Sequence, residues 1–213
     1  FVGGRSYSST MEIKMGGHAG ATGAIGAGKG STMEGFSAPV QAWFQGAFRA
    51  PTSAQIEAWE AIRSGANALV IAPTGSGKTL AAFLWAIDRL AREKGAKVPR
   101  PGPAADPVSK PRHDEPSEGV RVLYISPLKA LGVDVERNLR APLVGITEAC
   151  IAAGDVAPDI SVGVRSGDTT SSERRRLASH PPDILITTPE SLYLMLTGKT
   201  AETLRSVDTV IVD

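Results

Sequence analysis

Hydrophobic residues recur along positions 36–213 with two spacings, one typical of amphipathic helices and one of buried strands. Helical spacing covers the ranges 39–48, 54–63, 80–92, 129–139, about 171 onward and 189–196. Short apolar runs cover 68–72, 120–125, 160–164, 183–187 and 209–212. Because these strand-like runs alternate with helices, the pattern predicts an α/β fold with a mostly parallel sheet covered on both faces. The run at 68–72 is apolar at every position, so we expect a fully buried strand there.

Two segments do not follow either spacing. Residues 1–35 hold ten of the 23 glycines and few large apolar residues, so they cannot offset their ordering entropy by burial. Residues 95–118 hold six prolines and no aromatic residue, which is typical of a solvated insertion between a helix and a strand. We therefore expect a disordered segment at 1–35 and one partial domain at 36–213, interrupted by an insertion at 95–118.

The composition of the chain excludes several classes of protein and of binding site. Lys plus Arg number 23 and Asp plus Glu 22, so the net charge of the chain gives no long-range attraction to nucleic acid. A single cysteine excludes an internal disulfide framework, and three scattered histidines argue against a histidine-built metal site. No apolar run has the length of a bilayer span, so we expect no membrane association and a cytoplasmic location. The chain starts with Phe1 rather than Met and stops directly after a strand-like run, from which we expect a piece of a longer protein.

Residues 23–32 nearly spell the phosphate-loop pattern G-x-x-x-x-G-K-[ST]. Gly30 stands where the hydroxyl is needed, and no strand precedes this stretch and no helix follows it. A phosphate loop requires that context to aim its amides at the anion. We interpret this stretch as a low-complexity linker.

The second glycine-lysine motif, Ala72–Thr79, lies between a predicted buried strand and a predicted helix. Its expected ATP-binding residues are Thr74, Gly75, Ser76, Gly77, Lys78 and Thr79. The glycines let the backbone curl around phosphate oxygens, and Lys78 would contact the β and γ phosphates as a catalytic group. Thr79 would give its hydroxyl to Mg²⁺. The alternative is a glycine turn that caps a helix beside a solvated lysine.

The motif A-x-T-G-S-G-K-T resembles the variant found in superfamily 2 helicases, which implies a RecA-like P-loop NTPase domain. Upstream, Phe48, Pro51, Thr52 and Gln55 resemble the Q motif of these enzymes. The resemblance implies that Phe48 and Gln55 recognise adenine. A glutamine amide suits this role because it both donates and accepts hydrogen bonds.

Three further segments resemble nucleic-acid-binding motifs of the same superfamily: 126–131, 165–169 and 187–192, each directly after a predicted strand. Ligands of open α/β sheets bind beyond the carboxyl ends of the strands. The resemblance implies backbone contacts to nucleic acid from Pro127, Lys129, Gly167, Thr169, Thr187, Thr188 and Pro189. Lysine can pair with a phosphate, and threonine hydroxyls can donate to phosphate oxygens.

Longer phrases, among them SPLKALGVDVERNLRAPLVGI and PPDILITTPESLYLML, resemble the large helicase-related (Lhr) proteins of bacteria over about residues 36–213. That family consists of DNA-stimulated ATPases that translocate 3′ to 5′ and are associated with DNA repair. The resemblance implies ATP and Mg²⁺ as cofactors. Its implied partners are single-stranded or 3′-tailed duplex DNA and a second RecA-like lobe of the same parent chain.

Asp213 aligns with the motif II aspartate of this family, which holds Mg²⁺ and is a catalytic residue. The glutamate that follows in the family and the arginine fingers of the second lobe fall outside these residues. We therefore expect an incomplete first lobe that binds nucleotide without turning it over. The alternatives are an RNA-directed superfamily 2 helicase and a non-catalytic nucleotide-binding remnant. We interpret Arg174–Arg176 as a solvated helix face.

Overall fold

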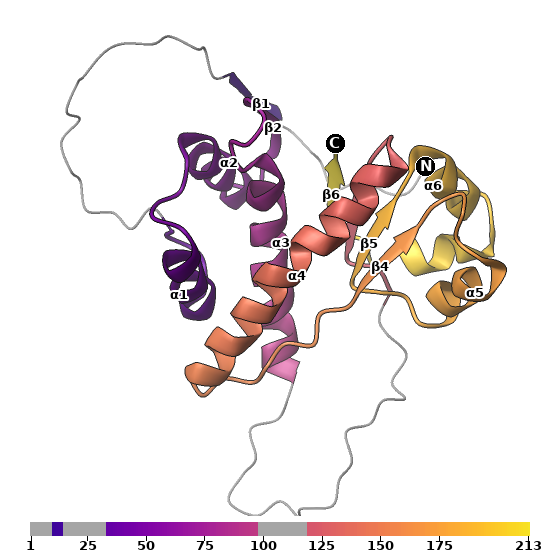
Figure 1. The fold of residues 1–213 in the computed structure, drawn as a ribbon. Coiled ribbons are helices and arrows are strands. Elements are labelled where there is room, and N and C mark those ends of the chain that lie inside the picture. Colours follow the sequence, from indigo (N-terminus) through magenta and orange to yellow (C-terminus); the bar gives the residue numbers. More distant parts are fainter. Residues whose placement is uncertain (1–9, 15–32, 98–118) are drawn as a thin grey trace, which may run out of the picture. The chain divides into compact units, whose positions relative to one another are not determined.

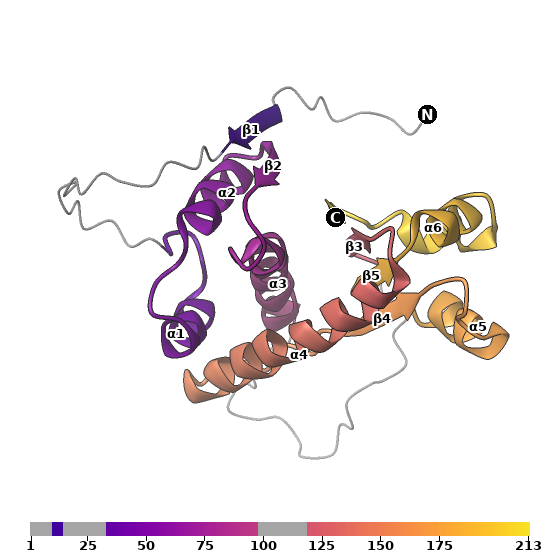
Figure 2. The same ribbon diagram turned by 45° about the horizontal axis from the view of Figure 1, so that its top comes forward.

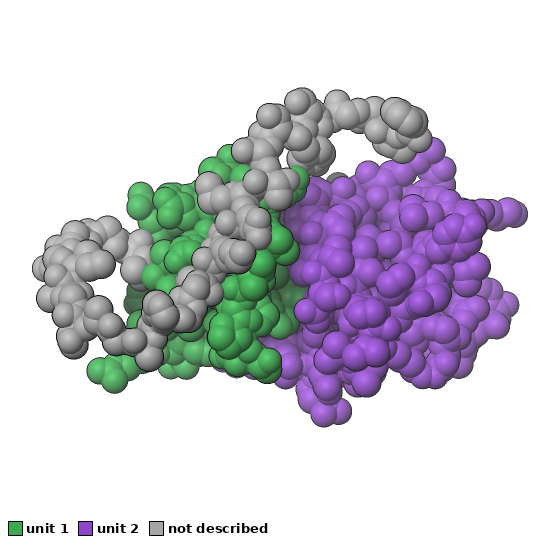
Figure 3. Space-filling view, turned by 90° about the horizontal axis from the view of Figure 1, so that it is seen from above, with its two compact units in different colours: residues 1–88 green, residues 89–213 purple. Residues whose placement is uncertain are grey.

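The computed structural model describes residues 10–14, 33–97 and 119–213, and the chain forms two compact units, residues 1–88 and 89–213 (Figure 3). The boundary falls inside one long helix, α3 (Lys78–Lys97). Residues 95–97 of the predicted insertion belong to this helix, and the remainder of the insertion lies outside the described residues. The stretch 23–32 also lies outside them.

The first unit contains a parallel strand pair, with two helices between the strands in sequence and the start of a third helix after them (Figure 1). Its described elements are β1 (Thr10–Lys14), α1 (Ala38–Ala47), α2 (Ser53–Arg63), β2 (Asn67–Ile71) and the start of α3. The register pairs Thr10 with Asn67 and Lys14 with Ile71. The predicted helices and the predicted strand of this unit are therefore all present.

Aromatic rings and small side chains make up the core of the first unit. The rings of Phe36 and Phe44 meet Trp59 edge to face, with centroid distances of 4.9 and 5.7 Å, an arrangement that the ring quadrupoles favour. Between α2, α3 and β2 the packed residues are small, namely Ala58, Ala61, Ala68, Val70 and Ala81. Small side chains let α2 and α3 approach closely, and Trp59 Nε1 donates a hydrogen bond to the Ala81 carbonyl at 3.0 Å.

The second unit is built on a four-stranded sheet with the order β4-β5-β3-β6, in which every pairing is parallel. Its elements are β3 (Val122–Ile125), α4 (Lys129–Ala152), β4 (Val162–Arg165), α5 (Ser171–Ser179), β5 (Ile184–Thr187), α6 (Pro189–Leu196), the 3₁₀ helix η1 (Lys199–Leu204) and β6 (Thr209–Val212). Four strands that the sequence predicted thus join in one parallel sheet.

Helices cover both faces of this sheet, as the alternation of strands and helices predicted (Figure 2). On the α4 face, Gly132 packs so closely on β5 that a Cβ at this position would lie 3.2 Å from Ile186 Cγ2. On the opposite face, Leu123 and Leu185 pack with Met195 of α6. The central strands are almost fully buried because both of their faces are covered.

Helix α4 is longer than predicted. We expected it to end near Leu139, whereas it continues to Ala152 and contains Pro142. Proline lacks an N–H and strains a helix interior. The buried residues Leu139, Pro142, Ile146 and Cys150 nevertheless continue the helical spacing, so tertiary packing overrides the local preference.

Strand β2 also differs from its prediction. Leu69 and Ile71 are 50% and 44% exposed, so β2 is not the fully buried strand that its apolar sequence indicated. Its described partner is β1, which lies in the segment expected to lack structure. The β1 sequence TMEIK contains neither glycine nor proline, and the edge of β2 offers unpaired backbone groups that such a segment can satisfy.

None of the described helices combines the length and the apolar character that crossing a bilayer requires. Among the described residues, α3 and α4 are long, with 20 and 24 residues, but both carry charged positions along their length.

We expect Ile186→Ala to lower the free energy of unfolding of the second unit by about 2–5 kcal/mol, because it removes a side chain buried between β5 and α4 and leaves a cavity. Val210→Ala, on the 56% exposed position of β6, is the control and should cost about 0.5 kcal/mol or less. Urea unfolding followed by circular dichroism measures both. Equal losses would contradict the described packing.

Candidate functional site

A tight loop, residues 72–77, joins β2 to α3 in the first unit. Gly75 and Gly77 both lie in the left-handed region, with φ of +81° and +82°, which residues with a Cβ rarely adopt. Consecutive amides in such turns face one concavity, and the N-terminus of a helix adds a potential that favours anions. The loop therefore has the backbone that the sequence predicted for a phosphate site.

Lys78 opens α3 directly after this loop. Its Nζ donates hydrogen bonds to the carbonyl oxygens of Ala72 and Pro73, the latter at 2.9 Å. These two carbonyls thus hold the ammonium group across the loop. A bound anion could take their place as its hydrogen-bond partner. Thr79 is exposed on the first turn of α3, where a hydroxyl can reach a bound cation.

The start of α2 holds the loop from one side. Thr52 Oγ1 donates to the Ser76 carbonyl at 2.9 Å, and Gln55 Nε2 donates to the Gly77 carbonyl at 3.3 Å. The same two residues form a capping box, in which the Thr52 amide donates to Gln55 Oε1 at 2.9 Å. Sequence reasoning assigned Gln55 to adenine; the structure shows that this residue first links the α2 cap to the phosphate loop.

Gln55 is only 4% exposed, so its amide has limited access to a ligand. Each end of the amide still has a second hydrogen-bonding position, because the NH₂ group carries two protons and the carbonyl oxygen two lone pairs. The adenine role of Gln55 remains a prediction. Phe48, its predicted companion, is 42% exposed beside Trp43 and Phe44, which leaves ring surface on which a base could stack.

One polar atom in the loop has no protein partner. Among the described residues, Ser76 Oγ is a buried side-chain atom that makes no hydrogen bond. A buried hydroxyl without a partner is costly, so such atoms usually mark a missing water, ion or ligand. This observation fits a loop whose interior is completed by a ligand.

In the second unit, the carboxyl ends of the strands form a single row. Ile125 of β3 pairs with Thr187 of β5 and with Val212 of β6, and Thr187 pairs with Arg165 of β4. The residues that follow these four are therefore neighbours at one edge of the sheet. Asp213 and the predicted nucleic-acid contacts other than Thr187, which is the last residue of β5, lie in the segments that leave this edge.

The predicted nucleic-acid residues differ in their exposure. Pro127, Lys129, Gly167 and Pro189 are exposed, whereas Thr169 and Thr188 are half-buried. Thr188 is the N-cap of α6, where its Oγ1 accepts from the Ser191 amide at 3.4 Å.

Thr187 departs from its expected role. It is 2% exposed, and its hydroxyl donates to the Arg165 carbonyl of the neighbouring strand at 2.9 Å. A buried hydroxyl that already donates its proton cannot also donate to a phosphate. The Thr187 hydroxyl therefore links β5 to β4 by a hydrogen bond in this structure.

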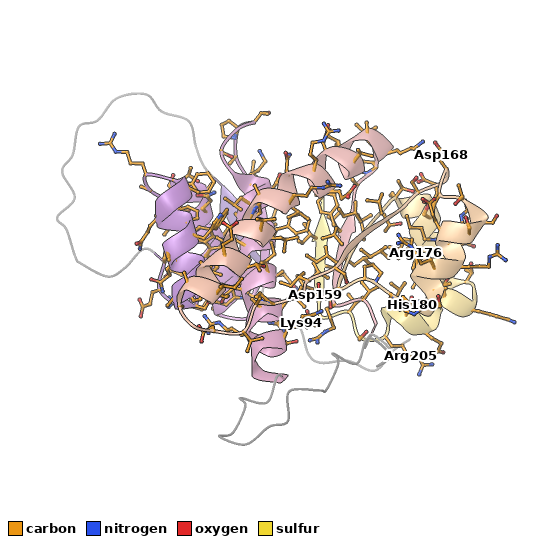
Figure 4. The ribbon with its side chains drawn as sticks, turned by 60° about the horizontal axis from the view of Figure 1, so that its bottom comes forward. Lys94, Asp159, Asp168, Arg176, His180 and Arg205 are labelled. Atoms are coloured by element: carbon orange, nitrogen blue, oxygen red, sulfur yellow. The ribbon has the colours of Figure 1, made fainter. Side chains whose placement is uncertain are left out.

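Lys129 forms an ion pair that the sequence did not predict. Its partner is Asp168, an exposed residue on the loop between β4 and α5 (Figure 4). Arg174 of α5 donates to the Gly167 carbonyl of the same loop at 2.8 Å. Arg174 is thus a half-buried contact rather than part of a solvated face, while Arg175 and Arg176 are exposed as expected. Opposite charges after two strands that are consecutive in the sequence, β3 and β4, were the signal that could have revealed Asp168.

Asp213 directly follows β6. Its amide donates to the Ile125 carbonyl at 3.0 Å, which extends the β3–β6 pairing by one residue. Its Oδ2 accepts a hydrogen bond of 2.7 Å from the Tyr124 hydroxyl. Burial raises the pKa of Tyr124, so this hydroxyl keeps its proton at neutral pH.

The residues present fit the chemistry of Mg²⁺. Thr79 and Asp213 supply hard oxygen atoms, and Mg²⁺ is commonly held by one or two carboxylates together with phosphates and waters. The described residues contain no cluster of three or more His, Cys, Asp or Glu side chains that could hold a metal ion without a nucleotide. Thr79 lies in the first unit and Asp213 in the second.

Comparison with known families and proteins supports these assignments at the level of fold and family. The sequence matches the DEAD/DEAH box helicase family over residues 52–213. It is 61% identical over 178 residues to the Lhr helicase/probable uracil glycosylase of Mycolicibacterium smegmatis and 51% identical over 178 residues to the Lhr helicase/uracil glycosylase of Escherichia coli. Each match covers 84% of this chain and 11% of the relative, so the chain spans about a tenth of the length of these proteins.

Among solved structures, the helicase Lhr of Mycobacterium smegmatis bound to single-stranded DNA and AMP-PNP is 57% identical, with a TM-score of 0.73. The match covers 86% of this chain and 21% of that one. The RecA-like α/β fold and the resemblance to Lhr helicases that the sequence predicted are confirmed.

Gly77→Ala should destabilise the first unit more than Gly75→Ala. Both substitutions place a Cβ at positive φ, which costs about 1–2 kcal/mol. A Cβ on Gly77 would in addition lie 3.1 Å from Gln55 Cδ and closer still to Nε2, whereas nothing lies within 4 Å of a Cβ on Gly75. Thermal unfolding of the two variants measures the difference. Equal melting temperatures would show that Gln55 does not brace the loop.

Proposed function

The chain belongs to the DEAD/DEAH box helicase family, and we propose that it is the ATP- and DNA-binding first lobe of an Lhr-type, 3′-to-5′ DNA helicase that serves DNA repair. The observation that carries this proposal is the loop at 72–79. Its two left-handed glycines, the hydrogen bonds of its lysine to loop carbonyls and the hydrogen bond from α2 support the assignment of this loop as a phosphate site. The names of the Lhr relatives support the helicase assignment.

In this proposal, the loop amides and Lys78 bind the nucleotide phosphates, and Phe48 and Gln55 contact the base. Thr79 in the first unit and Asp213 in the second each carry oxygen atoms of the kind that Mg²⁺ prefers, and the ion would neutralise charge on the phosphates. Turnover belongs to the whole protein, because these residues span about a tenth of the relatives and the arginine fingers of such motors come from a second lobe. The 213 residues alone should bind nucleotide without hydrolysing it.

The sheet edge of the second unit would bind one DNA strand through its backbone. Lys129 would pair with a phosphate, and Thr169 and the amides at the start of α6 would donate to phosphate oxygens, whereas the Thr188 hydroxyl already donates to Ser191 Oγ at 3.2 Å. Such contacts position a strand without reading its bases, which suits a motor that moves along any sequence. ATP-driven closure of two lobes would then move the strand through its different affinities for the open and closed states.

Lys78→Ala should abolish binding of ATP while leaving the fold intact, because it removes the ammonium group, whose hydrogen bonds are to two carbonyls of its own loop. Lys199→Ala, an exposed lysine outside both sites, is the matched control. A fluorescent ATP analogue titrated into each protein, with circular dichroism to check folding, measures the effect. Unchanged affinity in Lys78→Ala would overturn the assignment of the loop.

Asp168→Asn should tighten binding of single-stranded DNA about two- to fivefold, because it frees Lys129 from an exposed ion pair. Lys129→Ala should weaken binding and reduce the salt dependence by about one phosphate contact.

The control for Asp168→Asn is Asp155→Asn, which makes the same charge change beyond the far end of α4, about 36 Å along the helix. Fluorescence anisotropy with labelled DNA and RNA oligonucleotides at several salt concentrations measures these effects. If Asp155→Asn and Asp168→Asn have equal effects, only net charge matters; tighter binding of RNA would favour the RNA-directed alternative.

A further inference from the structure

We propose that Tyr124 is a positioning residue for Asp213, and that its hydroxyl fixes the carboxylate in the orientation in which it serves Mg²⁺. The inference rests on the proposed function, since it assumes that Asp213 serves the metal of a bound nucleotide. It adds a residue that lies in the middle of an apolar strand, outside every motif that the sequence analysis singled out.

The geometry makes the contact specific. Tyr124 is paired with Ile211 on the neighbouring strand, so its side chain shares a face of the sheet with the residue two positions further on, Asp213. The tyrosine ring spans that distance and ends in a hydrogen bond of 2.7 Å to Oδ2. At the same time the Asp213 amide is bound to the Ile125 carbonyl. Strand β3 therefore fixes both the backbone and the carboxylate of Asp213.

Tyr124 lies among apolar side chains apart from Ser126, whose side chain also hydrogen bonds with the tyrosine hydroxyl. Its neighbours on the same face, Val122, Ile184 and Ile186, are aliphatic and buried, and Tyr124 itself is 2% exposed. A phenylalanine would fill nearly the same volume without the cost of burying a polar group. A charge-assisted hydrogen bond to a carboxylate at the sheet edge helps to meet that cost, so the hydroxyl contributes to the position of Asp213.

The bond also leaves Asp213 able to serve a cation. A carboxylate has two oxygen atoms with about four acceptor positions, and the tyrosine takes one of them on Oδ2. Mg²⁺ requires nearly ideal octahedral geometry, so its affinity depends on the orientation of each ligand or of the group that holds its waters. Partners that hydrogen bond to a ligand typically contribute 10- to 100-fold to metal affinity or activity.

The test is the Mg²⁺ dependence of nucleotide binding in the 213-residue chain. A fluorescent ATP analogue is titrated in EDTA and over a series of Mg²⁺ concentrations, with circular dichroism to check that each variant folds. Tyr124→Phe should leave the affinity in EDTA unchanged and raise the half-saturating Mg²⁺ concentration about tenfold. Tyr193→Phe removes a hydroxyl from a 67% exposed tyrosine and should change neither quantity.

Two further variants separate the possible failures. Asp213→Asn should raise the half-saturating Mg²⁺ concentration at least as much as Tyr124→Phe. If Asp213→Asn does so and Tyr124→Phe does not, the positioning role is overturned and the proposed function stands. If Tyr124→Phe weakens binding equally in EDTA, its role is structural and the inference is wrong. If the unsubstituted chain and Lys78→Ala bind the analogue equally, the proposed function fails, and the inference fails with it.

Discussion

Parallel pairing of β3 with β5 and β6 is the constraint on which the second unit depends. Main-chain hydrogen bonds set Ile125, Thr187 and Val212 in one row, and β5 adds Arg165 to it. A shift of one residue in any of these strands would reverse the facing of its side chains and separate the segments that leave the edge. The nearness of the loops after β3, β4 and β5 is thus a property of backbone register.

The first unit depends on a different interaction, the N-terminal cap of helix α2. Thr52 and Gln55 satisfy the amides at the start of α2 and, with their remaining donors, bind two carbonyls of the phosphate loop. A loop with two glycines at positive φ has little conformational preference of its own. Bracing from α2 reduces the entropy that the loop would lose on binding an anion, which is the physical meaning of preorganisation here.

The sequence alone predicted most of the elements and the candidate residues of both sites, because strongly periodic segments and a strand–loop–helix context are local signals. The roles of those residues stay predictions. The predictions from sequence were wrong where long-range packing determines the end of a helix or the exposure of a strand. Helix α4 continues through Pro142 because Ile146 and Cys150 remain on its buried side. The exposure of Leu69 depends on what lies beside β2, which no local pattern can reveal.

The same distinction explains which site residues were missed. Lys129 and Asp213 follow predicted strands and belong to motifs, so residue type and position identified them. Their partners come from other strands: Asp168 follows β4, which β5 separates from β3, and Tyr124 lies on β3 beside β6. These contacts exist only once the order and register of the strands are set. Motifs thus point to the groups that are candidates for ligand contact, whereas the folded sheet determines which side chains hydrogen bond or pair with those groups. Tyr124 shows the consequence: within the strand sequence VLYI it resembles one more core residue, and only the pairing with β6 brings its hydroxyl to a carboxylate.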